Sequence, residues 1–354
     1  MRPDNKWLSV VIPVSALSSG LSVLIPLMIL SSKGNVFNVG FVITLYTLVG
    51  IPASLFWGRL TDKLRNIRLF VLFSIISIFP ELIILYFISN YKVIIISYAL
   101  YSFLATAASP SLNILVIGRR RNSSLSSYFS LYSIFIIIGG IFGMLPGLLI
   151  DSKYLYLYLL FLIFVNFISF ILAFRFIRPE FNKLMENRRI VHINRSFSIL
   201  NMLTTTQFLI TSHRLIHKLS FIIENRKSRM IYEFLLVISI FELGIYLFNT
   251  SYIPFLYHYS LDYSQIFLIN IFNLIGQTIV YLILIKYRRS VIGFYYRLAT
   301  LLRGSSYFIA FLPVLFLPSI LFQINLIAYF IAGFSYALWN VASSVILYSF
   351  IRGK

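Results

Sequence analysis

The sequence predicts an all-α protein that crosses a membrane several times, and three observations support this fold class. Of its 354 residues, 59% are hydrophobic and only 11% are charged, whereas soluble domains carry roughly 25% charged residues. The hydrophobic residues gather in runs of about 20 or more, which is the length a helix needs to span a bilayer. The basic residues lie almost entirely in every second connection between these runs. A soluble fold would leave large apolar patches in water, so most soluble enzymes and disordered chains are excluded.

Ten continuously apolar runs are expected to be spanning helices rather than barrel strands, because apolar and polar residues do not alternate within them. The expected spans are 8–30, 38–57, 69–88, 93–117, 127–150, 154–177, 231–256, 264–286, 298–318 and 322–350. The flank before the first run is too short and too acidic, with Asp4, for a cleaved signal peptide. We therefore expect a six-span bundle at 1–177, a cytoplasmic basic linker at 178–230 and a four-span bundle at 231–354.

The positions of Lys and Arg predict the orientation. If the N-terminus is cytoplasmic, only Lys33, Lys92 and Lys153 of the 30 basic residues fall outside. Basic residues are retained on the cytoplasmic side of a membrane, so both termini are expected there, in the plasma membrane. The net charge of +20 then arises from basic residues at the cytoplasmic face of the membrane, and we expect anionic lipid headgroups to be their partners. We expect no binding of nucleic acid.

The linker carries one ambiguous segment and three of the four histidines. Phe197–Ile210 is apolar enough to be considered as an eleventh membrane crossing. Its threonines, Asn201 and Gln207 instead favour a helix lying at the cytoplasmic interface. His213 and His217 have the i, i+4 spacing of a metal pair without an evident third ligand. The chain has no cysteine, which excludes disulfides and thiolate metal sites. We expect no metal and no cofactor.

The connection after the second run reads Gly58-Arg-Leu-Thr-Asp62-Lys-Leu-Arg65-Asn66-Ile-Arg68. It resembles the signature loop of the major facilitator superfamily, G-x-L-x-D-[RK]-x-G-R-[RK], which joins spans two and three. Arg65 and Asn66 depart from the pattern, because they stand where Gly-Arg is usual. The resemblance implies two helical bundles of that superfamily's type and a gating role for Gly58, Asp62, Lys63, Arg65 and Arg68. A basic topogenic loop, in which Asp62 only balances charge, is the alternative.

A second resemblance lies in the fifth expected span. Gly139, Gly143 and Gly147 fall at i, i+4 and i+8, on one face of a continuous helix. This is similar to the exporter motif G-x-x-x-G-P-x-x-G-G of the same superfamily, except that Met144 replaces the proline and Pro146 follows two residues later. The face implies either a pliable hinge, with efflux as the function, or simple close packing of helices.

The superfamily implies two similar six-span halves, whereas the second half here holds four. A twelve-span protein would need about 50 further residues, so we expect either a naturally short chain or a truncated one. The bases from Lys286 to Arg303 are expected in the cytoplasmic loop that matches the signature loop of the first half. No Lys or Arg would then lie deep in a span, which favours neutral, apolar or cationic substrates.

Acidic residues inside a bilayer are costly, so each is a candidate functional group. Glu242 lies near the middle of the seventh span, and Tyr246 and Asn249 share its face at i+4 and i+7. We expect this stripe to bind substrate or couple protons, with a hydrogen-bonded structural carboxyl as the alternative. Glu81 and Glu233 are weaker candidates. Four residues of spans four and ten are candidates for lining a cavity: Tyr98, Ser102, Tyr336 and Asn340.

Three function classes follow. The first is a monomeric secondary transporter that moves a small molecule by alternating access, coupled to protons. The second is a membrane-embedded enzyme, which we exclude because the spans hold no cluster of catalytic acids, histidines or cysteines. The third is a non-transporting sensor or scaffold of the same fold, or a truncated inactive transporter. We expect the first.

Overall fold

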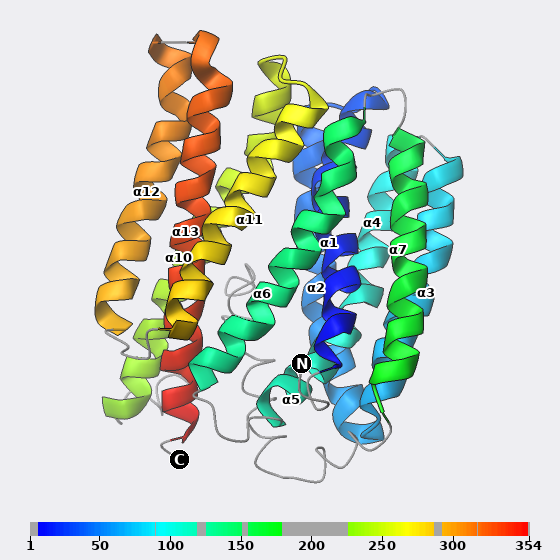
Figure 1. Cartoon of the computed structure of the whole chain (residues 1–354), viewed down its shortest axis with the longest axis vertical. Coiled ribbons are helices and arrows are strands. Elements are labelled where there is room, and N and C mark those ends of the chain that lie inside the picture. The colour runs from blue at the N-terminus through cyan, green and yellow to red at the C-terminus, as the bar shows by residue number, and fades with distance from the viewer. Residues whose placement is uncertain are drawn as a thin grey trace.

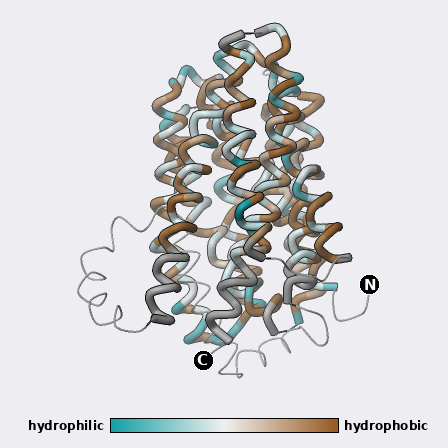
Figure 2. The backbone as a smooth tube through the Cα atoms, turned by 90° about the vertical axis from the view of Figure 1, so that its left-hand side faces the viewer, coloured by the Kyte–Doolittle hydropathy of each residue, from teal (hydrophilic) through white to brown (hydrophobic). Residues whose placement is uncertain are grey.

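The apolar runs form long helices, because in a bilayer every backbone N–H and C=O has to find its partner within the protein. The computed structural model describes residues 6–88, 90–118, 125–150, 155–178, 226–286, 292–316 and 318–352. Within these ranges, nine helical segments are long and apolar enough to cross a membrane. Figure 1 shows the helices side by side along one direction, and hydrophobic stretches follow their length in Figure 2. The predicted all-α membrane fold is confirmed.

The first six expected spans correspond to a set of seven α-helices and one short 3-10 helix. In chain order they are α1 (Leu8–Ser31), α2 (Val36–Leu64), α3 (Ile67–Phe87), α4 (Tyr91–Ala105), α5 (Ala108–Gly118), α6 (Leu125–Met144), η2 (Leu145–Leu149) and α7 (Leu155–Phe176). Three of these helices begin at an asparagine. The side chains of Asn35, Asn66 and Asn90 accept hydrogen bonds from backbone N–H groups of the first turn of α2, α3 and α4. Each bond satisfies one of the amides that a helix leaves unpaired at its start.

Prolines break two of the runs that the sequence predicts as single helices. The fourth span is divided into α4 and α5 by a turn at Thr106 and Ala107, because Pro110 has no N–H for the Thr106 carbonyl. The fifth span changes from α-helix to 3-10 helix after Met144, where Pro146 removes the next donor. The prediction of one continuous helix over 127–150 is therefore wrong beyond Met144.

The remaining expected spans correspond to α10 (Arg226–His258), α11 (Tyr263–Lys286), α12 (Ile292–Phe316) and α13 (Leu321–Arg352), with the short η6 (Pro318–Ile320) before α13. α12 is not among the nine segments above, but it is 25 residues long and packs along α13. Residues 179–225 lie outside the described ranges. The expected interfacial helix at 197–210 and the histidines His192, His213 and His217 fall there, and the division of the chain at this linker stays a prediction.

α1 is the central helix of the first half, because it packs against α4, α6 and α7. α13 has the same position in the second half, where it packs against α11 and α12. The halves meet where α6 contacts α11 and α13, and where α10 contacts α1 and α2. One apolar core runs across this boundary and includes Leu24, Tyr158 and Phe267. Large apolar side chains such as Phe37 and Phe87 point outward, as lipid-facing residues do.

Side chains that bond to backbone carbonyls join the helices within each half. In the first half, Trp57 on α2 donates to the Phe103 carbonyl at 2.8 Å, and Asn166 on α7 donates to the Ile75 carbonyl at 3.0 Å. In the second half, Ser335 on α13 donates to the Ala299 carbonyl at 2.7 Å. Such bonds are favourable in lipid because neither group has water as an alternative partner.

Candidate functional site

The predicted polar stripe of α10 faces an aromatic stripe on α13. Trp339 Nε1 donates to Glu242 Oε1 at 3.2 Å. Seven residues further along α10, Asn249 Oδ1 accepts a hydrogen bond of 3.2 Å from the Tyr329 hydroxyl. The lower residue number on α10 is paired with the higher number on α13, so the two helices run antiparallel. Their backbones approach less closely than those of α11 and α13. Long side chains therefore bridge the space between α10 and α13.

Trp339 is held rigidly, which fixes the donor that reaches Glu242. Its ring stacks on Phe241 with centroids 3.6 Å apart and lies 4.2 Å from the ring of Tyr296 on α12. Trp339 is only 2% exposed, whereas Glu242 is half-buried. The carboxyl group thus has a fixed protein donor in Trp339.

Arg303 is the main correction to the sequence analysis. It was expected at the end of a cytoplasmic loop, but it lies inside α12 and is only 6% exposed. Its Nη1 donates to the Ala332 carbonyl of α13 at 2.8 Å, and its Nε donates to the Tyr307 hydroxyl at 2.7 Å. Tyr296, seven residues earlier on the same helix, lies 4.2 Å from the ring of Trp339, the donor to Glu242, so Arg303 is on the face of α12 that borders this centre. A buried cation therefore exists, and the preference for neutral or cationic substrates loses its basis.

The helix that carries Glu242 and Tyr246 also borders the first half of the molecule. α10 contacts α1 and α2, and Tyr46 lies on α2. On the first-half side, the ring of Tyr98 on α4 stacks on Tyr46 with centroids 4.5 Å apart. Tyr336 lies on α13, three residues before Trp339. The structure thus places Glu242, Tyr246 and Tyr336 on the two helices of this centre, and Tyr98 in the first half.

Two predicted cavity residues instead join helices. Ser102 is buried and donates to the Tyr46 carbonyl at 2.6 Å, which ties α4 to α2. Asn340 donates to the Tyr281 hydroxyl at 2.8 Å, which ties α13 to α11. Both side chains hold neighbouring helices together, and their lining of a cavity stays a prediction.

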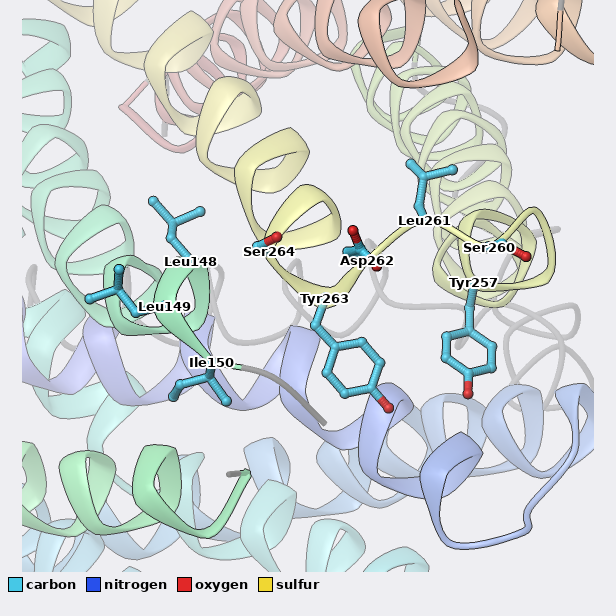
Figure 3. A pocket seen from close by; sticks show the side chains of 9 residues that line it. All are labelled: Leu148, Leu149, Ile150, Tyr257, Ser260, Leu261, Asp262, Tyr263 and Ser264. Carbon is cyan, nitrogen blue, oxygen red and sulfur yellow. The ribbon is translucent and has the colours of Figure 1, made fainter. Parts of the chain in front are cut away.

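A cavity of about 750 Å³ opens at the end of the bundle away from the start of α1 and the end of α13 (Figures 1 and 3). The first half contributes Leu148, Leu149 and Ile150, and the second half contributes the turn between α10 and α11. Tyr257 and Tyr263 point to the same side of that turn, with ring centroids 6.1 Å apart (Figure 3). The cavity therefore lies at the boundary of the two halves.

The geometry described so far agrees with a comparison against protein families. The family model described as Major Facilitator Superfamily matches residues 8–354. The chain belongs to this superfamily.

Solved structures of major facilitator superfamily transporters share the fold. The nucleoside transporter NupG has 14% sequence identity and a TM-score of 0.67, covering 100% of this chain and 86% of that one. The peptide transporter POT in complex with sulfate has 14% identity and a TM-score of 0.67, covering 99% and 88%. No curated protein matches the sequence. The family and the shared fold support a multi-pass membrane transporter.

The signature segment of the superfamily is helical here rather than a loop. α2 continues through Gly58, Asp62 and Lys63 to Leu64, so the connection to α3 consists of Arg65 and Asn66 alone. Asp62 is half-buried in the last turns of α2. Gating by these residues stays a prediction, but the segment is an ordered helix end rather than a flexible loop.

Arg65 and Arg68 complete the signature segment, and each has a structural role. Arg65 has φ 50° and ψ 33°, the left-handed conformation in which the superfamily pattern has glycine. Arg68 Nη2 donates to the Phe174 carbonyl at 3.1 Å, and its guanidinium lies 4.6 Å from the centre of the Phe174 ring. Arg68 therefore joins α3 to α7.

The three glycines of the predicted motif do not form one face. A Cβ atom at Gly139 or Gly143 would meet the backbone of α1 at Ile12 or Ala16, so these glycines allow α6 to lie directly on α1. Gly147 lies beyond the end of α6, in η2, and a Cβ there would meet the ring of Phe267 on α11. The packing interpretation accounts for the first two glycines, and Gly147 belongs to the contact between the halves.

Sequence reasoning missed Arg303, and it missed Tyr46 on the first-half side of the boundary. Arg303 and Tyr307 have the i, i+4 spacing of neighbours on a helix, and apolar residues flank them on both sides. That pattern could have placed Arg303 inside the ninth span. Tyr46, by contrast, gave no signal, because one tyrosine in an apolar run looks like any other.

Proposed function

We propose that this protein carries a small solute across the plasma membrane by alternating access, and that the transport is coupled to protons at Glu242. The observation that carries the proposal is the contact of Glu242 with Trp339, with Arg303 on the face of α12 that borders this centre. A carboxyl group in a span persists only where it has partners and usually has a function. The proposal includes cytoplasmic termini, a monomer and a cytoplasmic surface that contacts anionic headgroups.

The three helices that hold this centre give the coupling a physical basis. Glu242 on α10, Arg303 on α12 and Trp339 on α13 form one polar group in an apolar medium, where charge interactions are strong. A proton on Glu242 removes the negative charge that faces Arg303. The guanidinium then attracts an anionic group of a solute more strongly, and loss of the proton restores the negative charge of Glu242. A proton and an anionic solute would therefore bind cooperatively through Arg303.

The cavity between Leu149 and Tyr263 supports an entry route at the end away from the termini. Because it is lined by both halves, a relative movement of the halves would open or close it. Export stays a prediction. The glycines that suggested it are accounted for by helix packing, so they do not favour export over import.

The test begins with ligand binding and then measures flux. Purified protein is screened by thermal shift at two pH values against nucleosides, short peptides, sugars and organic ions, because binding to the folded state raises the melting temperature. A hit is then assayed in liposomes with a proton gradient. Glu242→Gln is expected to lose gradient-driven flux while ligand-free folding and exchange of solute at equal concentrations persist.

Ser251→Ala is the control on the same helix, since Ser251 is exposed, bonds to the backbone carbonyls of Leu247 and Phe248, and lies outside both the centre and the cavity lining. It is expected to retain gradient-driven flux. Equal gradient-driven flux in wild type and Glu242→Gln would contradict proton coupling at this residue.

A further inference from the structure

The exposed side of α2 holds a groove that the proposed transport site does not use. Its volume is about 390 Å³, and its lining residues in the described part of the chain all belong to α2: Pro52, Leu55, Phe56, Arg59, Leu60 and Lys63. They are spaced at i, i+3, i+4, i+7, i+8 and i+11, so they form one stripe along the helix. The groove therefore runs along the axis of α2.

This side of α2 is covered by few other helices. Only 22% of the apolar stretch of α2 is buried, compared with 67% in α1. In the groove, Phe56 is 50% exposed and Pro52 is also exposed, whereas Ala53 and Trp57 on a neighbouring side of the helix are buried. An exposed apolar surface on a spanning helix contacts the hydrocarbon of the bilayer. The apolar part of the groove is thus suited to the acyl chain of a lipid.

Two exposed basic residues, Arg59 and Lys63, lie one turn apart at one end of the groove. No acidic residue is among its described lining residues. Asp62 is next to Lys63 in the chain, so the net charge stays positive even when its carboxylate is counted. This end of α2 lies at the end of the bundle where α1 begins (Figure 1), which the basic residues predict to be cytoplasmic. The charges therefore lie in the leaflet whose surface is negative because of anionic lipids.

The length of the groove matches one leaflet of the bilayer. α2 extends from Val36 to Leu64, so Pro52 lies near its middle and Lys63 at its end. At the helical rise per residue, the axial distance from Pro52 to Lys63 is about 16 Å. One leaflet supplies half of the hydrocarbon core, or about 15 Å. A lipid whose phosphate binds beside Lys63 can therefore extend its acyl chain along the groove as far as Pro52.

We propose that this groove is a binding site for one anionic phospholipid of the cytoplasmic leaflet. The Arg59 guanidinium and the Lys63 ammonium bind the phosphate, and an acyl chain packs along Pro52, Leu55 and Phe56. Arginine can donate two parallel hydrogen bonds to a phosphate, and lysine adds a compact positive charge. This goes beyond a general attraction of the basic surface for headgroups, since one site binds both the headgroup and the chain.

The inference rests on the proposed cytoplasmic orientation of this end of α2, but not on transport or on proton coupling. Lipid binding can be measured on the full chain without any solute, and Glu242→Gln should bind the lipid as the wild type does. If the coupling at Glu242 fails, the lipid site still stands, and loss of the lipid site leaves the coupling proposal unchanged.

The test is native mass spectrometry of the full chain in detergent, which resolves each bound lipid by its mass. Phosphatidylglycerol and phosphatidylcholine with the same acyl chains are titrated separately. The first phosphatidylglycerol is expected to bind about tenfold more tightly than the first phosphatidylcholine, since each base near a headgroup contributes about a factor of five. Arg59→Gln/Lys63→Gln should remove this preference. Leu55→Trp, which fills the groove and keeps both bases, should weaken the binding of both lipids.

Lys33→Gln/Lys92→Gln is the matched control, because it removes two exposed bases at the opposite end of the bundle, and it should keep the preference for phosphatidylglycerol. Melting curves of each variant show whether it is folded. Equal affinity for the two lipids, an unchanged preference in Arg59→Gln/Lys63→Gln, or the same loss in the control would overturn the proposal.

Two further arms identify other occupants of the groove. Displacement of phosphatidylglycerol by an equal concentration of glycerol 1-phosphate would show that a free phosphate is bound rather than a lipid. A dimer in the mass spectrum that Leu55→Trp converts to a monomer would show that the groove binds a second copy of the chain. Either result would also overturn the proposal.

Discussion

Arg65 shows how one residue can depart from a family pattern and still follow its geometry. The turn between α2 and α3 needs a left-handed residue, and glycine is the usual choice because it has no Cβ. In this chain an arginine adopts that conformation with φ 50°. An L-residue other than glycine is strained in this region by about 1–2 kcal/mol. The turn is therefore set by the helices that it joins rather than by the preference of Arg65.

Arg65→Gly should accordingly stabilise the protein. The strain relieved exceeds the additional chain entropy that glycine loses on folding, which leaves a net gain of up to about 1 kcal/mol. Thermal unfolding of the purified protein in detergent measures the change. Arg59→Gly removes the same charge from the exposed face of α2 and should destabilise by about 1 kcal/mol, because it places glycine inside a helix. A lower melting temperature in Arg65→Gly would show that the arginine side chain itself is needed.

Arg303 illustrates why the partners of a site residue could not be predicted. The sequence indicates charge and hydropathy along the chain, and a base soon after a basic loop is typical of a span end. Its burial arises from contacts with Ala332 and Tyr307, which depend on how α12 packs on α13. Glu242, by contrast, was predictable because an acid in the middle of an apolar run is informative by itself.

Among the helices, α6 shows how close packing depends on two glycines. Gly139 and Gly143 lie against backbone atoms of α1, with no space for another atom. Two helices that approach this closely gain many weak contacts along their length, which is a main source of helix association in lipid. The spacing predicts this face, but the sequence does not indicate that α6 ends before Gly147.

Gly143→Ala should therefore weaken the contact of α6 with α1. The new methyl group would meet the Ala16 backbone, and overpacking of this kind costs about 1–3 kcal/mol. Thermal unfolding is the measurement. Gly304→Ala in α12 is the matched control, because a Cβ there meets nothing within 4 Å. It should stabilise by up to about 1 kcal/mol, since alanine favours a helix more than glycine does. Equal loss of stability in both variants would contradict the packing argument.

At the scale of the whole molecule, the basic residues predict which end faces the cytoplasm. α1 begins and α13 ends at the same end of the bundle (Figure 1). Lys33 and Lys92 lie at the opposite end, and Lys63 lies at the end of the termini; all three are exposed. The span count and the asymmetry of charge could be predicted from the sequence. The arrangement of the helices in space could not, because lipid-facing and protein-facing apolar residues look alike in a run such as α7.

Because the chain has no cysteine, single-cysteine variants can test this orientation without further changes. In intact cells, a membrane-impermeant maleimide should label Lys33→Cys and Lys92→Cys. Lys63→Cys should react only after the membrane is permeabilised, since the positions of the basic residues predict that its end faces the cytoplasm. Labelling of Lys63→Cys in intact cells, with Lys33→Cys protected, would show the opposite orientation.

The hydrogen bonds that join side chains to carbonyls within each half also predict a response to mechanical force. Trp57, Asn166 and Ser335 each tie two helices of the same half together. A chain pulled out of the bilayer from its C-terminus should therefore resist in clusters of helices rather than one helix at a time. The second half should leave first, with rupture events set by the bonds around α13. The first half should then stay anchored until the bonds that hold α7 and α2 break at higher load.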